Sequence, residues 1–437
     1  MSKKRIKYTP IDKLTPWALP DQLEDELRKL YSLACQNSKP LWDALGANGA
    51  EITQEVRHEF ISLVHLGMRQ AQHFMLHNLL NDQDNKLHDV RVFAYRGIAD
   101  SMAWQLLMKE LAYAKRFFQA VQPPKLDSSN IQSVIAVTEK LHEEEPDSIA
   151  LISDLTSFIQ VGDIIHMSHK YKMKVYEVKE GEVNQQILET LKKLTVDPDE
   201  RLYEQLVGSQ STSFKKQFER TLRQKARMQT VQDTLKNDKG VDFSSGLEIK
   251  IVTAPFSVGT WYPALIEAYE QCKSRGWGIA VDQGCLFLGC YDSKSLKLPG
   301  QIVFEGWFSG MGATEDCPRT SLVNSMLDPL ALPIYSLPLP DELKFDLLFG
   351  RKHVAMGISV QRLIAECKKF GVVIDSASQK TTTQLAQKNN FFWKYNGRAL
   401  ILSTKNKQIT LGEGFALRVF FHGESPVDAM MAMALCE

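Results

Sequence analysis

The sequence predicts a multidomain protein of the α+β class, with a helical N-terminal region, a central α/β core and a C-terminal region of mixed helices and strands. Two observations support this prediction. The chain has 437 residues, which is more than a single hydrophobic core usually organises. The spacing of apolar residues also changes along the chain, from the period of amphipathic helices to short β-rich runs.

The N-terminal domain is expected at residues 1–125. Long segments there place apolar residues at the spacing of a helix, over 20–36, 53–80 and 97–121. A stretch with two prolines and several polar residues, QPPKLDSSN, follows these segments and predicts the end of the domain.

The central domain is expected at residues 126–240. A polar stretch, KNDKGVDFSSG (236–246), marks its end. The pattern predicts a helix over 131–145, β-rich runs at 148–156, 163–169 and 174–180, and helices over 183–194 and 213–235.

Residues 241–437 are expected to form a third domain of mixed α and β structure. An Asn-Gly pair between alternating apolar runs predicts a hairpin at 391–404. This region contains no nucleophile elbow, P-loop or dinucleotide fingerprint, so its pattern leaves its role open. Helices are predicted over 262–275 and 360–371, and strands over 247–254, 278–292, 372–376 and 415–423.

Composition narrows the class of protein. The chain has 52 basic and 52 acidic residues, so nucleic-acid binding would have to come from a local patch. The seven cysteines are odd in number and form no C-x-x-C pair, which favours reduced thiols in a cytoplasmic protein. No apolar run approaches the ~20 residues that span a membrane, so no membrane partner is expected.

The stretch VGDIIHMSHKYKMKVYEVKEGE, residues 161–182, carries the candidate chemistry. It is typical of a β-hairpin in which DIIHM runs outward and KVYEVK returns. Side chains of a strand alternate between faces, so Glu177 and Lys179 share a face at about 6–7 Å along the strand. Antiparallel pairing then brings Asp163 beside Glu177, whereas His166 points to the opposite face. The alternative is a surface hairpin with solvated charges at its ends.

Two converging carboxylates repel each other, and a divalent cation relieves that repulsion. Mg²⁺ or Mn²⁺ fits this site, because hard cations prefer carboxylate, carbonyl and water oxygens. The candidate ligands are Asp163, Glu177 and the backbone carbonyl of Val178. Asp154, which follows an apolar run, is either a further ligand or a cap at a turn. Lys179 is placed to orient a water molecule for attack on phosphorus.

A Gly-Asp pair, about a dozen residues and then apolar-Glu-apolar-Lys resembles the active-site signature of the PD-(D/E)XK superfamily, the restriction-endonuclease-like nucleases. The resemblance covers about residues 131–235. It implies a restriction-endonuclease-like core in which Asp163 opens one strand, Glu177 and Lys179 lie on the next strand, and a helix follows. It also implies Mg²⁺-dependent phosphodiesterase activity, and its uncharacterised bacterial members suggest a role in defence or in a mobile element.

Many members of this superfamily carry a further glutamate on the helix before the first strand. The candidates in this chain are Glu139 and Glu143, and spacing does not choose between them. The identity of this additional acid therefore stays open at this point.

A basic helix follows the signature. Arg220, Arg223 and Arg227 recur at three- and four-residue spacing, so they share one helical face. Together with Gln224 they suit the phosphate oxygens of a nucleic-acid backbone. The alternative is the solvated face of an ordinary helix.

These features predict a metal-dependent nuclease with DNA as its expected substrate. The alternative is a non-catalytic nucleic-acid-binding or scaffold protein on the same fold. Because an unregulated nuclease harms its host, a regulatory protein partner or a homo-oligomer is also expected.

Overall fold

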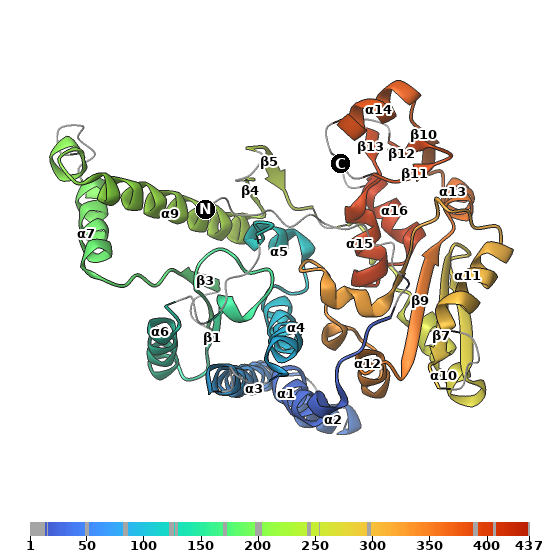
Figure 1. Cartoon of the computed structure of the whole chain (residues 1–437), viewed down its shortest axis with the longest axis horizontal. Coiled ribbons are helices and arrows are strands. Elements are labelled where there is room, and N and C mark those ends of the chain that lie inside the picture. The colour runs from blue at the N-terminus through green and yellow to red at the C-terminus, as the bar shows by residue number, and fades with distance from the viewer. Residues whose placement is uncertain are drawn as a thin grey trace. The chain divides into compact units, whose positions relative to one another are not determined.

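The computed structural model contains mixed α and β structure with several small sheets, which confirms the predicted α+β class (Figure 1). The described chain begins with a series of helices, and from α6 (Ile131–Glu144) onward helices and strands are interspersed. The residues that the structure describes are 14, 16–48, 52–81, 86–121, 126, 130–168, 173–196, 203–242, 246–252, 254–294, 299–387, 392–404 and 408–435.

The contacts of the described residues divide the chain into two compact units. Residues 29–251 form the first unit, and residues 14–28 join those from 252 onward in the second. The segments expected as separate domains at 1–125 and 126–240 therefore lie largely within one unit. Hydrogen bonds from the N-terminal helices to the central strands account for this arrangement.

Helices make up most of the first unit. Helix α4 lies at its centre, where Ala94, Ile98, Met102 and Trp104 are all fully shielded from solvent. The helices up to residue 251 are α1 (Glu24–Gln36), α2 (Lys39–Asn48), α3 (Gln54–Asn81), α4 (His88–Leu106), α5 (Leu111–Phe117), α6 (Ile131–Glu144), α7 (Glu182–Val196), a π-helical turn η4 (Glu204–Gly208) and α9 (Thr212–Asn237).

The central sheet of this unit has three antiparallel strands in the order β1-β2-β3. They are β1 (Ile149–Ile152), β2 (Ile164–Met167) and β3 (Met173–Tyr176). All of β1 and most of β2 are buried, so this sheet forms part of the core. The predicted strand positions are confirmed, although the strands are shorter. Much of the predicted turn, residues 169–172, lies outside the described residues.

Side chains from two helices pair with the outer edge of β1. Gln72 of α3 donates from Nε2 to the carbonyl of Ala150 at 3.0 Å, and its Oε1 accepts from the N–H of Ile152 at 2.9 Å. His142 of α6 accepts from the N–H of Ala150 through Nε2 at 2.9 Å. Because an unpaired buried backbone group is costly, these bonds fasten α3 and α6 to the sheet.

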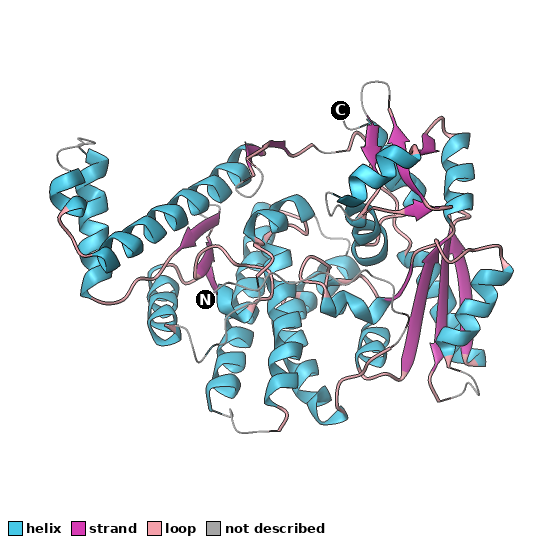
Figure 2. Cartoon of the chain, turned by 45° about the horizontal axis from the view of Figure 1, so that its top comes forward, coloured by secondary structure: helices cyan, strands magenta, loops and turns pink. Residues whose placement is uncertain are grey.

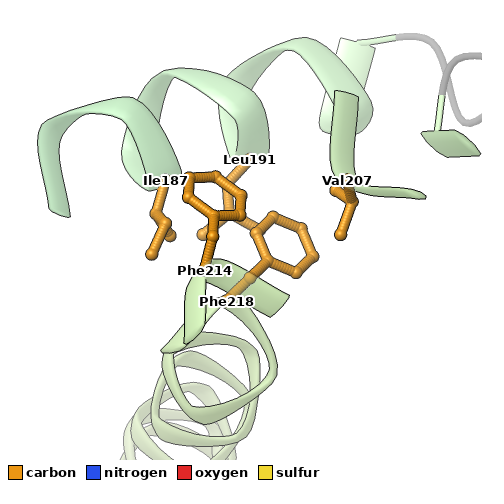
Figure 3. Packing of buried hydrophobic residues seen from close by; sticks show 5 residues of the cluster. All are labelled: Ile187, Leu191, Val207, Phe214 and Phe218. Atoms are coloured by element: carbon orange, nitrogen blue, oxygen red, sulfur yellow. The ribbon is translucent and has the colours of Figure 1, made fainter. Parts of the chain in front are cut away.

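A small hydrophobic cluster joins α7, η4 and α9 (Figure 3). Phe214 and Phe218 of α9 point toward Ile187 and Leu191 of α7, and Val207 of η4 lies beside them (Figure 3). The side chain of Ser211 caps the start of α9 by accepting from the N–H of Phe214 at 3.2 Å. The cluster holds the first turns of α9 against α7.

The end of α9 leads into a short hairpin of β4 (Lys239–Val241) and β5 (Glu248–Lys250). Helix α5 holds this segment, because Tyr113 donates to Asp238 and Arg116 donates to Asp242, each at 2.6 Å. The polar stretch expected as a break at 236–246 is therefore attached to the first unit, with residues 243–245 outside the described residues.

The second unit contains two antiparallel sheets. The first has the strand order β6-β7-β9-β8, and α10 packs on β6 and β7 while α11 packs on β7 and β9 (Figure 2). The second has the order β10-β12-β11, with β13 also paired to β12. The strands are β6 (Trp277–Asp282), β7 (Leu286–Asp292), β8 (Arg319–Ser321), β9 (Lys352–Ile358), β10 (Val373–Ser376), β11 (Lys394–Tyr395), β12 (Arg398–Ser403) and β13 (Gln408–Thr410).

Helices precede, separate and follow the strands of these two sheets along the chain. Across the residues that the structure describes, no helix combines the length and the apolar character needed to cross a membrane. The helices of this unit are α10 (Tyr262–Arg275), α11 (Gly300–Gly310), α12 (Asp341–Leu348), α13 (Val360–Lys369), α14 (Gln379–Gln387), α15 (Glu413–His422) and α16 (Pro426–Leu435).

The chain before α1 belongs to the second unit. The N–H of Leu19 donates to the carbonyl of Leu348 at 2.8 Å. Arg351 donates to both carboxylate oxygens of Glu24, at 2.7 and 2.8 Å, and to Asp346 at 2.7 Å. This segment was expected in an N-terminal helical domain, but its contacts place it in the second unit.

The strand predicted over 415–423 is wrong, because this segment forms helix α15. Its apolar residues are buried on nearly all sides, and a short continuous apolar run does not distinguish a buried strand from a buried helix. Gly423 ends the helix in a left-handed conformation with φ of 80°, which is common at helix C-termini.

We expect Gln72→Leu to lower the free energy of unfolding by about 2–4 kcal/mol, because it leaves two buried backbone groups of β1 without their partners. Gln70→Leu is the matched control, since Gln70 is an exposed glutamine of the same helix. Chemical denaturation of both variants measures the difference. Equal stabilities would show that Gln72 does not close the edge of the sheet.

Candidate functional site

The hairpin of β2 and β3 brings the two predicted acids opposite each other. Ile164 pairs with Tyr176, so the same antiparallel register places Asp163 across from Glu177. The N–H of Asp163 donates to the carbonyl of Tyr176 at 2.7 Å, which extends the ladder to this position. The carboxylate of Asp163 accepts from the N–H of Val178 at 2.6 Å. The predicted hairpin and its register are therefore confirmed.

Glu177 and Lys179 also meet as strand alternation predicts. The Nζ of Lys179 lies 2.6 Å from Oε1 of Glu177, and the two side chains are only 13% and 15% exposed. The same Nζ donates to Oε1 of Gln224 on α9 at 2.9 Å. The ammonium group is thus held between the end of β3 and the middle of α9.

The environment of Asp163 opposes its ionisation. Burial raises the pKa of its carboxyl to about 6, the nearby charge of Glu177 adds to the rise, and the bond from the Val178 N–H partly offsets it. Asp154 raises this pKa further, whereas Lys179 lowers it. Two carboxylates and one ammonium group therefore interact within one partly buried site.

Asp154 lies in a short 3₁₀ turn, η3 (Ser153–Leu155), directly after β1. Its charge acts on Asp163 and also on Arg96 of α4. Another acid near this turn is Asp100 of α4. It accepts from both the N–H and the hydroxyl of Ser157, at 2.7 and 2.5 Å. Asp154 is thus close enough to interact with both Asp163 and the guanidinium of Arg96. Its role as a metal ligand stays a prediction.

The remaining carboxylate candidates lie on α6. Both Glu139 and Glu143 are exposed to solvent. Neither is among the groups that shift the pKa of Asp163. The structure therefore gives no support for either glutamate as part of the site.

The oxygen atoms at the hairpin suit a hard divalent cation in type. Asp163 and Glu177 offer carboxylates, and the carbonyl of Val178 accepts from Nδ2 of Asn130 at 3.2 Å while keeping a second lone pair. Within the described residues, no group of three or more His, Cys, Asp or Glu side chains is arranged to hold a metal. Mg²⁺ does not require such a group, because it usually retains several waters.

The four predicted nucleic-acid-binding residues of α9 separate into two pairs. Arg220 and Arg223 are exposed. Gln224 instead bonds to Lys179, and Arg227 donates to Gln119. Arg227 is partly buried, and this burial lowers the pKa of its guanidinium. The shared helical face therefore leaves Arg220 and Arg223 open to a ligand, whereas Gln224 and Arg227 contact other parts of the unit.

Histidine behaves as predicted at this hairpin. His166 is 2% exposed and lies on the face opposite Asp163, with its ring centroid 6.0 Å from that of Tyr176. His169, at the predicted turn, lies outside the described residues.

Sequence reasoning did not identify Asn130 or Gln119 as neighbours of the site. Asn130 lies 48 residues from Val178, and Gln119 lies 108 residues from Arg227. No local spacing connects residues so far apart, and both fall near a polar stretch that resembled a simple break between domains. Only the tertiary contacts reveal them.

Comparison with known proteins gives no independent indication of family. No model of a known protein family matches the chain, and neither a curated protein nor a solved structure shows significant similarity to it.

We expect Asp163→Asn to stabilise the protein above pH ~6 in EDTA, by on the order of 2 kcal/mol. Because the folded state raises the pKa of Asp163 from 3.8 to about 6, its contribution to stability falls as the pH rises between those values. Asparagine can still accept from the Val178 N–H, but it carries no charge. Thermal unfolding from pH 4 to 8 measures the effect.

The matched control for this measurement is Asp43→Asn, an exposed aspartate of α2 in the same unit. It should leave the pH profile of the wild type unchanged. An Asp163→Asn profile that runs parallel to the wild type would contradict the assigned environment of Asp163.

Proposed function

We propose that this chain is a metal-dependent nuclease that hydrolyses phosphodiester bonds, with DNA as its expected substrate. One observation carries the proposal: Asp163 and Glu177 face each other across the hairpin, and Lys179 contacts Glu177 at 2.6 Å. An acid pair beside a lysine supplies both a site for a cation and a group that can orient water. The order of strand, strand and helix also supports the resemblance to PD-(D/E)XK nucleases.

Mg²⁺ or Mn²⁺ would be held by the carboxylates of Asp163 and Glu177 and by the carbonyl of Val178, and Asp154 is the candidate for an additional ligand. When bound, such a cation polarises a phosphoryl oxygen and lowers the pKa of a coordinated water. Burial and, after it, repulsion from Glu177 raise the pKa of Asp163, and a bound cation would offset both effects. The unfavourable charge arrangement of the hairpin is thus the physical basis for expecting a cation.

Lys179 would orient the attacking water and stabilise the charge that develops on the phosphate. Its ammonium group has three donors, and two of them meet Glu177 and Gln224. The third donor meets no acceptor among the described residues, so it can bind a water or a phosphate oxygen. Gln224 is a positioning residue in this proposal, because it acts through Lys179.

A second candidate is a non-catalytic nucleic-acid-binding or scaffold protein. The observation in its favour is the ion pair between Glu177 and Lys179, which satisfies the glutamate without a cation. In that case the two residues stabilise the contact between the hairpin and α9, and the exposed Arg220 and Arg223 carry the binding. A regulatory protein partner or a homo-oligomer, and a role in bacterial defence or in a mobile element, belong to the first candidate.

The nuclease proposal predicts Mg²⁺- or Mn²⁺-dependent nicking of plasmid DNA that EDTA abolishes. Glu177→Gln and Lys179→Ala should each lower the rate by about 10²-fold or more, because each removes a group that acts on the reacting atoms. Lys174→Ala is the matched control, since Lys174 lies on the other face of β3, opposite His166. Its rate should stay close to that of the wild type.

Unchanged metal-dependent cleavage in both site variants would show that other residues carry the activity. If the folded wild type cuts nothing with any divalent metal, the non-catalytic candidate is supported instead.

The activity should also rise with pH through about 6. A cation competes with a proton for Asp163, whose pKa is raised to about 6, so metal binding should weaken as the pH falls below that value. The concentration of Mn²⁺ that gives half-maximal cleavage, measured between pH 5 and 8, checks this expectation. An activation constant that does not change with pH would argue against Asp163 as a ligand.

A further inference from the structure

A surface groove lies between the first turns of α7 and α9. Its cavity volume is about 570 Å³. Residues of both helices line it, and most of them are polar or charged. The lining residues are Val183, Asn184, Ser213, Lys216, Gln217, Glu219, Arg220 and Arg223.

Three cations face this groove from α9. Lys216, Arg220 and Arg223 are separated by four and three residues, which places them on one side of the helix. All three are exposed, and none forms a hydrogen bond or ion pair with the described part of the chain. Glu219 is the one acid in the lining, so the formal charge of the groove is positive.

One hydrogen bond joins the two walls of the groove, and a second holds the side chain that accepts it. Gln217 of α9 donates to Oδ1 of Asn184 on α7 at 3.1 Å. Nδ2 of Asn184 then donates to the carbonyl of Glu180 at 2.6 Å. The hydrophobic cluster of Phe214 and Phe218 lies beneath the same helical turns (Figure 3). The groove is therefore supported by packing and does not depend on its exposed side chains.

The groove leads toward the candidate catalytic hairpin. Gln224 follows Arg223 directly and bonds to Lys179, and Glu180 follows Lys179. At 1.5 Å per residue, Lys216 lies about 12 Å from Gln224 along α9. The three cations thus form a row that ends beside the lysine of the hairpin.

We propose that this groove binds the sugar-phosphate backbone of a nucleic-acid strand without reading its sequence. Guanidinium and ammonium groups pair well with phosphate oxygens, and several polar side chains add donors. The lining contains no aromatic residue, and Val183 is its only apolar member, so it offers no stacking surface for bases. The inference rests on the proposed nuclease, for which it specifies a polymeric substrate that extends beyond the scissile phosphate.

The test is binding of the 437-residue chain to a fluorescent single-stranded DNA of about 20 nucleotides in EDTA, by fluorescence anisotropy over a range of salt concentrations. The triple variant Lys216→Gln, Arg220→Gln, Arg223→Gln should bind about tenfold or more weakly. It should also reduce the slope of log K against log salt by about 2, because three phosphate contacts are lost at about 0.7 each. A second DNA of shuffled sequence should give the same affinity.

The matched control is Lys225→Gln, Lys236→Gln, which removes charge from exposed positions on the other side of α9. It should keep the affinity and salt slope of the wild type. Thermal unfolding establishes that both variants are folded. Equal losses in the two variants, or wild-type binding by the triple variant, would overturn the proposed groove.

Because EDTA prevents metal-dependent cleavage, the binding result stands apart from catalysis. If the triple variant binds like the wild type and Glu177→Gln is inactive, the groove proposal is wrong and the nuclease proposal is supported. If the triple variant binds more weakly but the wild type never cuts DNA, the groove proposal is supported and the nuclease proposal is wrong.

Discussion

The candidate site depends on the register between β2 and β3. Pairing of Ile164 with Tyr176 sets Asp163 across from Glu177 and leaves His166 on the opposite face. A slip of one residue would move every side chain of one strand to the other face and separate the acids. In β3 only Val175 is buried, so a slip of this strand is opposed because it would move Val175 to the more exposed face. The register of a short, buried hairpin thus determines which charges meet.

Three glutamines of helix α9 bond to neighbouring elements, two of them to this hairpin and one to α7. Gln217 bonds to Asn184, Gln224 accepts from Lys179, and Gln232 donates to the carbonyl of Val175 at 3.5 Å. An amide can both donate and accept without the desolvation cost of a charge, which suits it to a contact beside charged groups. The arginines of the first turns remain exposed along the same helix. One helix therefore combines support for the candidate catalytic lysine with a positively charged surface.

Charge at the hairpin opposes the stability of the folded chain. Burial and the charge of Glu177 both raise the pKa of Asp163, so its ionised form is disfavoured when no cation is present. A buried acid on α4, Asp100, has its pKa raised to about 7, mainly by burial, although two bonds from Ser157 oppose the rise. The bonds of Asp100 hold a turn that follows β1, which gives it a structural explanation. Asp163 likewise accepts one backbone bond, from the N–H of Val178, but it also lies opposite a second carboxylate, that of Glu177.

The sequence by itself determined the α+β class, the hairpin, the shared face of Glu177 and Lys179, and the exposed Arg220 and Arg223. These features follow from local periodicity, because side chains of strands and helices repeat over two to four residues. Only the tertiary structure decided that Gln72 closes the edge of β1, that Asn130 contacts Val178, that Arg227 turns to Gln119 and that α15 is a helix. These outcomes depend on which segments pack together, and bonds between residues as far as 108 positions apart leave no local pattern.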